Sequence, residues 1–135
     1  MDLTDRLACT DTILALDDAY AAAYAAIDDS LMSVCRDRVA MLLRHQPTLS
    51  TMSAEQRSAL SNHSGSDRYT DLEQTALDFT EQYIIDVTAL SDRQAERLRA
   101  HLGNEGLVDF VNSLLVIEQR MTLELALDRV LGEAS

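Results

Sequence analysis

Apolar residues recur every three or four positions through residues 71–90, with polar residues between them. The apolar residues that share one face of this segment are Leu72, Ala76, Phe79, Tyr83, Val87 and Leu90. A period near 3.6 places them on one side of an α-helix, and that side must be buried against other elements. The run Tyr83–Ile85 has strand-like composition, but it falls inside the longer helical register, so we predict one helix over 71–90.

A second apolar segment covers residues 105–131. Its main face is formed by Leu107, Val111, Leu114, Met121 and Leu125, with Val108, Phe110 and Leu115 beside it. A helix that is apolar around so much of its circumference is either central to the fold or exposed to a partner. We therefore predict that it is the central helix or one half of a subunit interface.

Capping signals mark where several helices begin and end. Ser53 with Gln56, Thr70 with Glu73, and Ser91 with Gln94 each match a capping box. We expect Pro47, Gly103 and Gly132 to close helices, because proline lacks the amide donor and glycine accepts the left-handed cap. The predicted helices cover about 11–27, 30–45, 54–62, 71–90, 92–102 and 105–131.

These elements predict an all-α bundle of about six helices, and the scarcity of turn residues agrees, with one Pro and four Gly in 135 residues. Residues 1–29 hold seven Asp and one Arg, so we expect an acidic N-terminal helix or arm there. Residues 30–135 would form the helical domain. The loop-like stretch 61–70 is interpreted as a connection within that domain, because neither half alone would bury much core.

The charge balance narrows the choice of partners. The formal net charge is −12, from 23 acidic residues against 11 basic ones, all of them Arg. Nucleic acids and anionic membranes are normally held by basic patches, so neither is expected as a partner. No run approaches the roughly 18 apolar residues of a membrane-spanning helix. Cys9 and Cys35 form no CxxC pair or disulfide framework, which favours a reduced, cytoplasmic protein.

The second half of the chain also carries a family pattern. It includes Leu72-Glu73, Ala76–Glu81, Ser91-Asp92, Leu98 and Leu107-Val108, preceded upstream by the arginine-bearing segment Arg36–Leu42. Over roughly residues 31–131, the sequence resembles the alkylhydroperoxidase D-like, or carboxymuconolactone decarboxylase-like, family. The resemblance implies an all-α fold and obligate homo-oligomers, and it makes Arg36 and Arg38 candidate binding residues. Because these two arginines lie two positions apart, they point to different helix faces, and pairing of at least one with an acid such as Asp37 is expected.

The redox members of that family carry a CxxC motif followed by a histidine. In this chain the corresponding positions hold His45, Thr48 and Met52. A dithiol mechanism needs a thiolate and a resolving thiol one helical turn away, and neither is present at these positions. Cys35 shares a stripe with Leu31 and Val39, so we expect an inert thiol in the core.

Glu118 is the polar residue that stands out, because it falls in line with the apolar face of 105–131. A buried carboxylate needs an arginine or several donors, or it must protonate. We consider a structural ion pair, with Arg38, Arg120 or Arg129, a polar contact between subunits, and a general acid or base. His45, near the end of a helix, is the second candidate catalytic residue.

No metal site or cofactor is expected. His45, His63 and His101 lack HxxxH, HxxE or CxxC spacing to a second ligand on the same element. We interpret His63 as a surface residue of a loop and His101 as a cation near a helix C-terminus.

Two functions remain open. One is a cysteine-less alkylhydroperoxidase D-like protein that keeps the oligomeric scaffold as a non-redox structural or regulatory subunit, or binds a small molecule. The other is an enzyme of the carboxymuconolactone decarboxylase-like type, with acid–base chemistry in a pocket between helices 30–45 and 105–131. Glu118 with an arginine or His45 would perform that chemistry.

Overall fold

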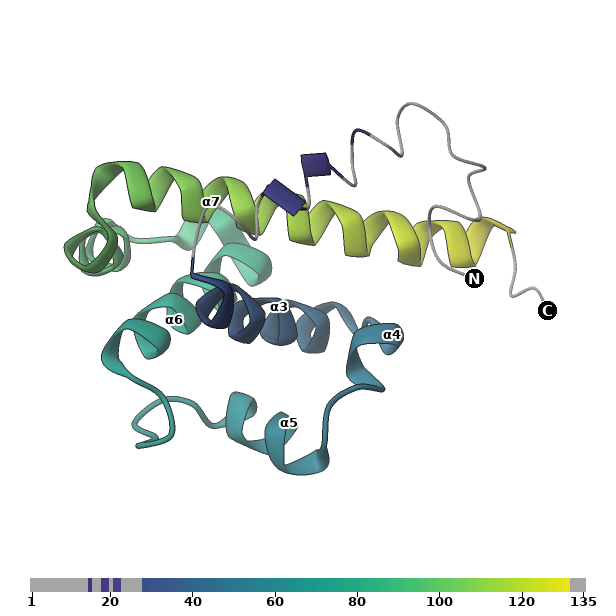
Figure 1. Cartoon of the computed structure of the whole chain (residues 1–135), viewed down its shortest axis with the longest axis horizontal. Helices are drawn as coiled ribbons and strands as arrows, with labels where there is room; N and C mark the ends of the chain where they lie inside the picture. The colour runs from purple at the N-terminus through teal and green to yellow at the C-terminus, as the bar shows by residue number, and fades with distance from the viewer. Residues whose placement is uncertain (1–14, 16–17, 20, 23–27, 132–135) are drawn as a thin grey trace.

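The computed structural model describes residues 15, 18–19, 21–22 and 28–131 (Figure 1). In this part of the chain the elements are helical and no strand occurs, which confirms the all-α prediction. They are α3 (Asp29–Leu43), α4 (Gln46–Leu49), α5 (Ala54–Ser61), α6 (Asp71–Asp86), the 3-10 turn η1 (Val87–Ala89) and α7 (Asp92–Leu131). The helix expected over 11–27, and most of the acidic segment 1–29, lie outside the described residues.

The described residues thus contain five α-helices, rather than about six. The two segments predicted at 92–102 and 105–131 are both present, but they form the single element α7, which is interrupted at Gly103. Gly103 has φ 77° and ψ 175°, a backbone conformation that glycine tolerates and other residues resist. The helix is kinked at this residue, and Figure 1 shows that α7 changes direction within its length.

Two other helix ends differ from the prediction for local reasons. The helix predicted to end at Leu90 ends at Asp86, whose carboxylate accepts hydrogen bonds from the amide and hydroxyl of Thr88 and starts the 3-10 turn. Pro47 does not close α3. It lies in the first turn of the short helix α4, where its missing amide donor costs nothing.

All three capping boxes form as expected. Ser53 and Thr70 each accept from the amide three residues on, and Gln56 and Glu73 bond back to the cap amides. Ser91 and Gln94 make the same reciprocal pair, at 3.0 and 3.1 Å. These contacts fix the starts of α5, α6 and α7.

The main core lies where α3, α6 and α7 pack against one another. Its buried side chains are Leu31, Met32, Cys35, Val39, Ala40, Ala76, Phe79, Leu98, Leu107, Phe110, Leu114, Ile117 and Met121. The rings of Phe79 and Phe110 meet edge to face, with centroids 5.9 Å apart. A smaller cluster of Leu49, Met52, Leu60 and Leu77 joins α4 and α5 to this core. The face of 105–131 that was predicted to be buried is thus largely buried, with Val111 and Leu125 partly exposed.

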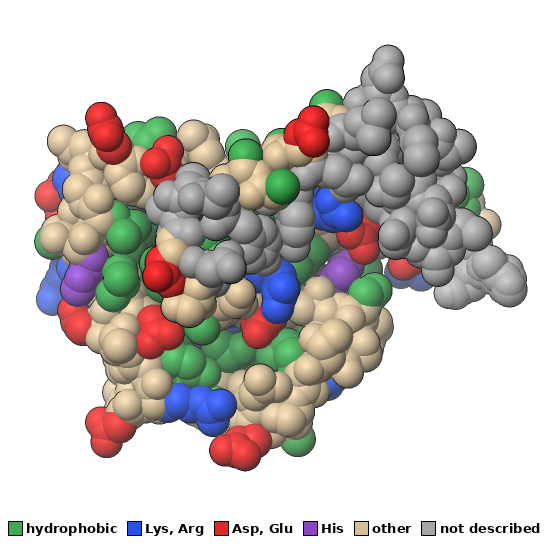
Figure 2. Space-filling view, viewed as in Figure 1, with side chains coloured by type: hydrophobic (Ala, Val, Ile, Leu, Met, Phe, Trp, Pro, Cys, Tyr) green, Lys and Arg blue, Asp and Glu red, His purple; other side chains and the backbone are tan. Residues whose placement is uncertain are grey.

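No helix in the described part of the chain combines the length and the apolar character needed to cross a bilayer. On the face seen in Figure 2, acidic side chains are spread around the margin and hydrophobic side chains gather between α3 and α5. A pocket of about 260 Å³ lies in that region, and Val34, Leu60 and Tyr69 are among its lining residues.

Candidate functional site

The end of α3 turns the chain inward and buries His45. Arg44 follows the helix in the left-handed conformation, with φ 61° and ψ 45°, and is the one described non-glycine residue with positive φ. The amide of His45 then bonds back to the carbonyl of Ala40, at 2.8 Å. This helix end resembles a Schellman-type termination, and it leaves the His45 side chain only 6 % exposed.

Both ring nitrogens of His45 have partners. Nε2 lies 3.0 Å from Oε2 of Glu124 on α7, and Nδ1 lies 2.9 Å from the hydroxyl of Thr48 on α4. An ionised carboxylate only accepts, so Glu124 selects the tautomer with a proton on Nε2, and the neutral ring then accepts from Thr48 through Nδ1. The Thr48 hydroxyl, the His45 imidazole and the Glu124 carboxylate form a chain of hydrogen bonds. In this geometry the carboxylate orients the imidazole, which can act as a base. Arg120 is 3.4 Å from the other oxygen of Glu124.

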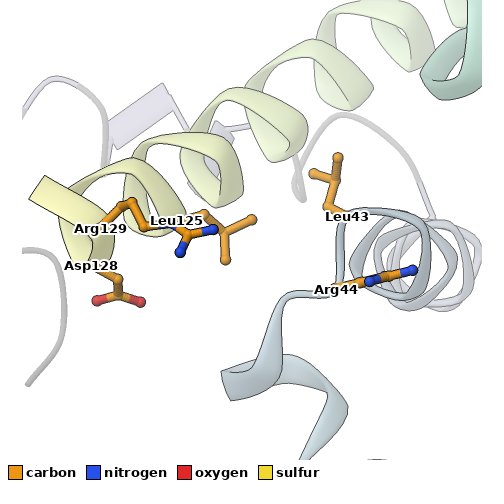
Figure 3. Close-up of a pocket in the computed structure, with 5 residues that line it drawn as sticks. All are labelled: Leu43, Arg44, Leu125, Asp128 and Arg129. Carbon is orange, nitrogen blue, oxygen red and sulfur yellow. The ribbon is translucent and has the colours of Figure 1, made fainter. Parts of the chain in front are cut away.

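A pocket of about 550 Å³ lies between the end of α3 and the last turns of α7, the two helices that the His45–Glu124 contact joins (Figure 3). The described residues that line it are Leu43, Arg44, Leu125, Asp128 and Arg129. Arg44 precedes His45 in the sequence and Leu125 follows Glu124. Aliphatic and charged groups therefore meet in this pocket, whose described lining includes sequence neighbours of His45 and Glu124 but neither residue itself.

Glu118 is not part of that arrangement. Its carboxylate is half-buried and accepts from the hydroxyl of Thr122, at 3.2 Å. Among the described residues it forms no ion pair with Arg38, Arg120 or Arg129. Burial, and secondarily the charge of Glu118, raise the pKa of Tyr83. The carboxylate that reaches His45 belongs to Glu124, six residues further along α7.

The two arginines singled out by the resemblance have separate roles, as their spacing predicts. Arg36 bonds the carboxylate of its neighbour Asp37, at 2.8 Å. Arg38 reaches across to α6 and bonds Oε1 of Glu81, at 2.7 Å. Neither is among the described residues that line the pocket beside His45.

Cys35 is a core residue, as expected. Its side chain is fully buried, and this burial raises the pKa of the thiol to about 12. Almost no thiolate therefore exists at neutral pH, and peroxide has no nucleophile to meet at this position. Cys9 lies outside the described residues.

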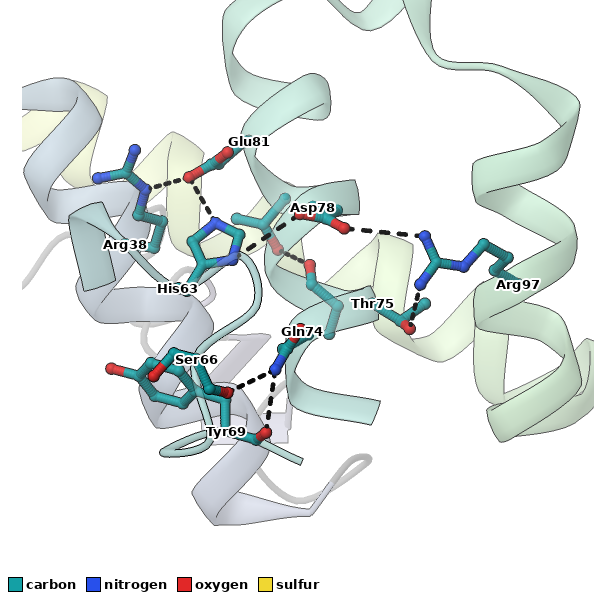
Figure 4. Close-up of polar contacts among 11 residues, drawn as sticks. Arg38, His63, Ser66, Tyr69, Gln74, Thr75, Asp78, Glu81 and Arg97 are labelled. Carbon is teal, nitrogen blue, oxygen red and sulfur yellow. Dashed lines mark hydrogen bonds and ion pairs between the residues drawn. The ribbon is translucent and has the colours of Figure 1, made fainter. Parts of the chain in front are cut away.

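The interpretation of His63 as a surface residue is wrong. It follows α5 in the connection to α6, yet only 3 % of the residue is exposed. Nε2 lies 2.8 Å from Oε1 of Glu81, and Nδ1 lies 3.8 Å from Oδ1 of Asp78 (Figure 4). Asp78 and Glu81 are three residues apart, so they share a face of α6, and this spacing is the one sequence signal that pointed to the contact.

His101 has a carboxylate partner as well. Its Nε2 lies 2.8 Å from Oδ2 of Asp71, which links α7 to the first turn of α6. The His101 side chain is 30 % exposed and that of Asp71 is 78 % exposed, in contrast to the buried His63.

Comparison of the chain with family models, characterised proteins and solved structures gives no significant match.

Proposed function

We propose that this chain is a non-redox, small-molecule-binding protein built on an alkylhydroperoxidase D-like oligomeric scaffold. The observation that supports it most directly is the contact between His45 and Thr48, beside the pocket between α3 and α7. In the family that the sequence resembles, these two positions would hold the redox cysteines. Here they hold an imidazole and a hydroxyl, which bond to each other and cannot form a disulfide.

The lining of the pocket favours a particular kind of ligand. Leu43 and Leu125 offer an apolar surface, while Arg44 and Arg129 contribute two positive charges against the one negative charge of Asp128. Pockets that combine an apolar wall with a few charged groups suit small molecules with a matching apolar body and polar head. The proposed ligand is accordingly a small organic acid, with its carboxylate directed to Arg129.

Exposed apolar side chains support the oligomeric part of the proposal. Val108 is 58 % exposed and Leu115 is 39 % exposed on α7, and Ile85 at the end of α6 is 68 % exposed. Val108 and Leu115 are seven residues apart and therefore share one face of α7, and exposed apolar surface that is gathered on one face is a feature of subunit interfaces. We propose a homo-oligomer that covers part of α7, in the reducing environment of the cytoplasm, which suits the free thiol of Cys35.

A thermal-shift screen of small aliphatic and aromatic carboxylic acids tests the binding function. We expect at least one acid to raise Tm of the wild-type protein, and we expect Arg129→Ala to remove that shift. Arg93→Ala is the matched control, because Arg93 is an exposed arginine at the opposite end of α7. A panel that produces no shift, or a shift that survives Arg129→Ala, contradicts the proposal.

A second function, acid–base catalysis of the carboxymuconolactone decarboxylase-like type, is supported by the Thr48–His45–Glu124 chain. A catalytic role differs from binding in the effect of removing the base. His45→Asn should then abolish turnover of a carboxylated lactone while the thermal shift caused by a bound acid remains. If the wild-type protein turns over no member of a lactone panel, this second function is eliminated.

A further inference from the structure

Polar contacts hold the connection between α5 and α6, residues 62–70, against α6. The side-chain amide of Gln74 donates to the carbonyls of Ser66 and Tyr69, at 2.7 and 3.2 Å (Figure 4). His63, at the start of the same connection, is directed between Asp78 and Glu81 (Figure 4). One polar atom of this cluster lacks a partner: in the part of the chain that the structure describes, Nδ1 of His63 is buried without a hydrogen bond.

An orphaned buried nitrogen requires an explanation, because leaving it unpaired costs free energy. The nearest carboxylate oxygen is Oδ1 of Asp78, at 3.8 Å. This distance is too long for a hydrogen bond. It does suit two ligands of one metal ion, since atoms that each lie about 2.1 Å from an ion can be at most about 4.2 Å apart. Ligand atoms of His63, Asp78 and Glu81 all lie within 4.8 Å of one another.

We propose that His63, Asp78 and Glu81 form a binding site for a divalent transition-metal ion of the zinc class. Nδ1 of His63 and Oδ1 of Asp78 are the primary ligands. Glu81 accepts from Nε2 of His63, which keeps the lone pair on Nδ1, and it supplies the second carboxylate of the site. A metal-binding histidine held by a carboxylate through its other nitrogen is a recurrent arrangement in metal sites.

The two neighbouring arginines are placed so that they leave the ligand atoms accessible. Arg97 lies 3.8 Å from Oδ2 of Asp78, on the oxygen that does not face His63. Arg38 bonds Oε1 of Glu81 and therefore reinforces its role as the acceptor for His63. The side chains of Asp78 and Glu81 are 34 % and 25 % exposed, so an ion can enter from solvent and water can complete its coordination.

The choice of ion follows from the donor set. One imidazole nitrogen with carboxylate oxygens suits zinc and its neighbours, whereas magnesium prefers an all-oxygen environment and keeps its water ligands. Bound metal would tie residues 62–69 more firmly to α6. The site thus has a structural role, separate from the pocket beside His45.

Isothermal titration of the full-length protein with Zn²⁺ at pH 7.5 tests the proposal, with Mg²⁺ as the control ion. We expect one saturable Zn²⁺ site per chain, an increase in Tm of about 5–10 °C at a hundredfold excess over Kd, and no site for Mg²⁺. Hydrogen exchange of residues 62–69 should slow when Zn²⁺ is bound.

Variants locate the site. Asp78→Asn should weaken Zn²⁺ binding at least tenfold and abolish the change in hydrogen exchange, and His63→Ala should do the same. Because His63 is buried and its replacement can impair folding, the more exposed Asp78 provides the decisive variant. His101→Ala is the matched control, since His101 also pairs with an aspartate, and it should leave the Zn²⁺ affinity unchanged. Equal responses to Mg²⁺ and Zn²⁺, or unchanged Zn²⁺ affinity in Asp78→Asn, would overturn the proposal.

Discussion

Replacing Glu124 with alanine should destabilise the protein by removing the acceptor of a buried hydrogen bond. The His45 side chain is 6 % exposed, and Nε2 lies 3.0 Å from the Glu124 carboxylate. A buried donor left without its partner costs about 1–3 kcal/mol. Glu124 is itself 23 % exposed, so water can partly fill the space that it leaves, and we expect a loss of about 2 kcal/mol. For a chain of this size that corresponds to a fall in Tm of roughly 5–10 °C.

Glu118→Ala is the matched control for that prediction. Glu118 lies on the same helix and is also half-buried, but its described hydrogen bond comes from the hydroxyl of Thr122, which is exposed and can bond water instead. Its removal should cost less than about 0.5 kcal/mol. Glu124→Gln keeps an acceptor for His45 and should fall between the two alanine variants.

Urea unfolding followed by circular dichroism at 222 nm measures all three variants, at one protein concentration because oligomers gain stability with concentration. The m-value should be unchanged. If Glu118→Ala destabilises the protein more than Glu124→Ala does, then Glu118 and not Glu124 is the carboxylate of α7 that contributes more to stability. That result would refute the proposed role of the Thr48–His45–Glu124 chain.

Three further predictions concern other parts of the chain. Cys35 should resist a thiol reagent in the folded protein and react after unfolding. Because burial raises the pKa of this thiol in the folded state, its contribution to stability is complete below about pH 9 and is lost as pH rises toward 12. The Cys35→Ala variant should not show this loss of stability. Asp28 caps α3; a hydrogen bond from the hydroxyl of Ser30 and, secondarily, those from the amides of Leu31 and Ser30 lower the pKa of its carboxyl. Its contribution to stability is therefore present above about pH 4 and is lost as pH falls further, and Asp28→Asn should flatten this acid limb in a pH series of Tm. Gly103→Ala should cost about 1–3 kcal/mol through its backbone conformation alone, because an added Cβ meets no atom within 4 Å; an unchanged urea midpoint would contradict this.

The parts of the fold that depend on local sequence were predictable. The boundary at Thr70 follows from its capping box with Glu73, and the buried face of α7 follows from the spacing of Leu107 and Leu114. Burial of Cys35 could be inferred because its neighbours along the helix at three- and four-residue spacing are apolar. In each case the signal lies within one or two helical turns, where the physical interactions are short-range.

The candidate sites were harder to predict because their residues meet across the fold. His45 and Glu124 are 79 residues apart, and no periodicity connects them. Glu118 attracted attention because of its place in the apolar stripe, whereas the contact with His45 depends on how α3 and α7 cross. His63 was misinterpreted because a polar connection suggests exposure, yet its imidazole is covered by α6.

The break at Gly103 has a consequence for the rotational phase of α7. Leu98 and Leu107 are nine residues apart, and at about 100° per residue an uninterrupted helix would direct them to opposite sides. Both nevertheless belong to the same core, with 0 % and 9 % exposure. The non-helical residue between them resets the phase, so that the segments before and after it can each direct leucine toward α3 and α6.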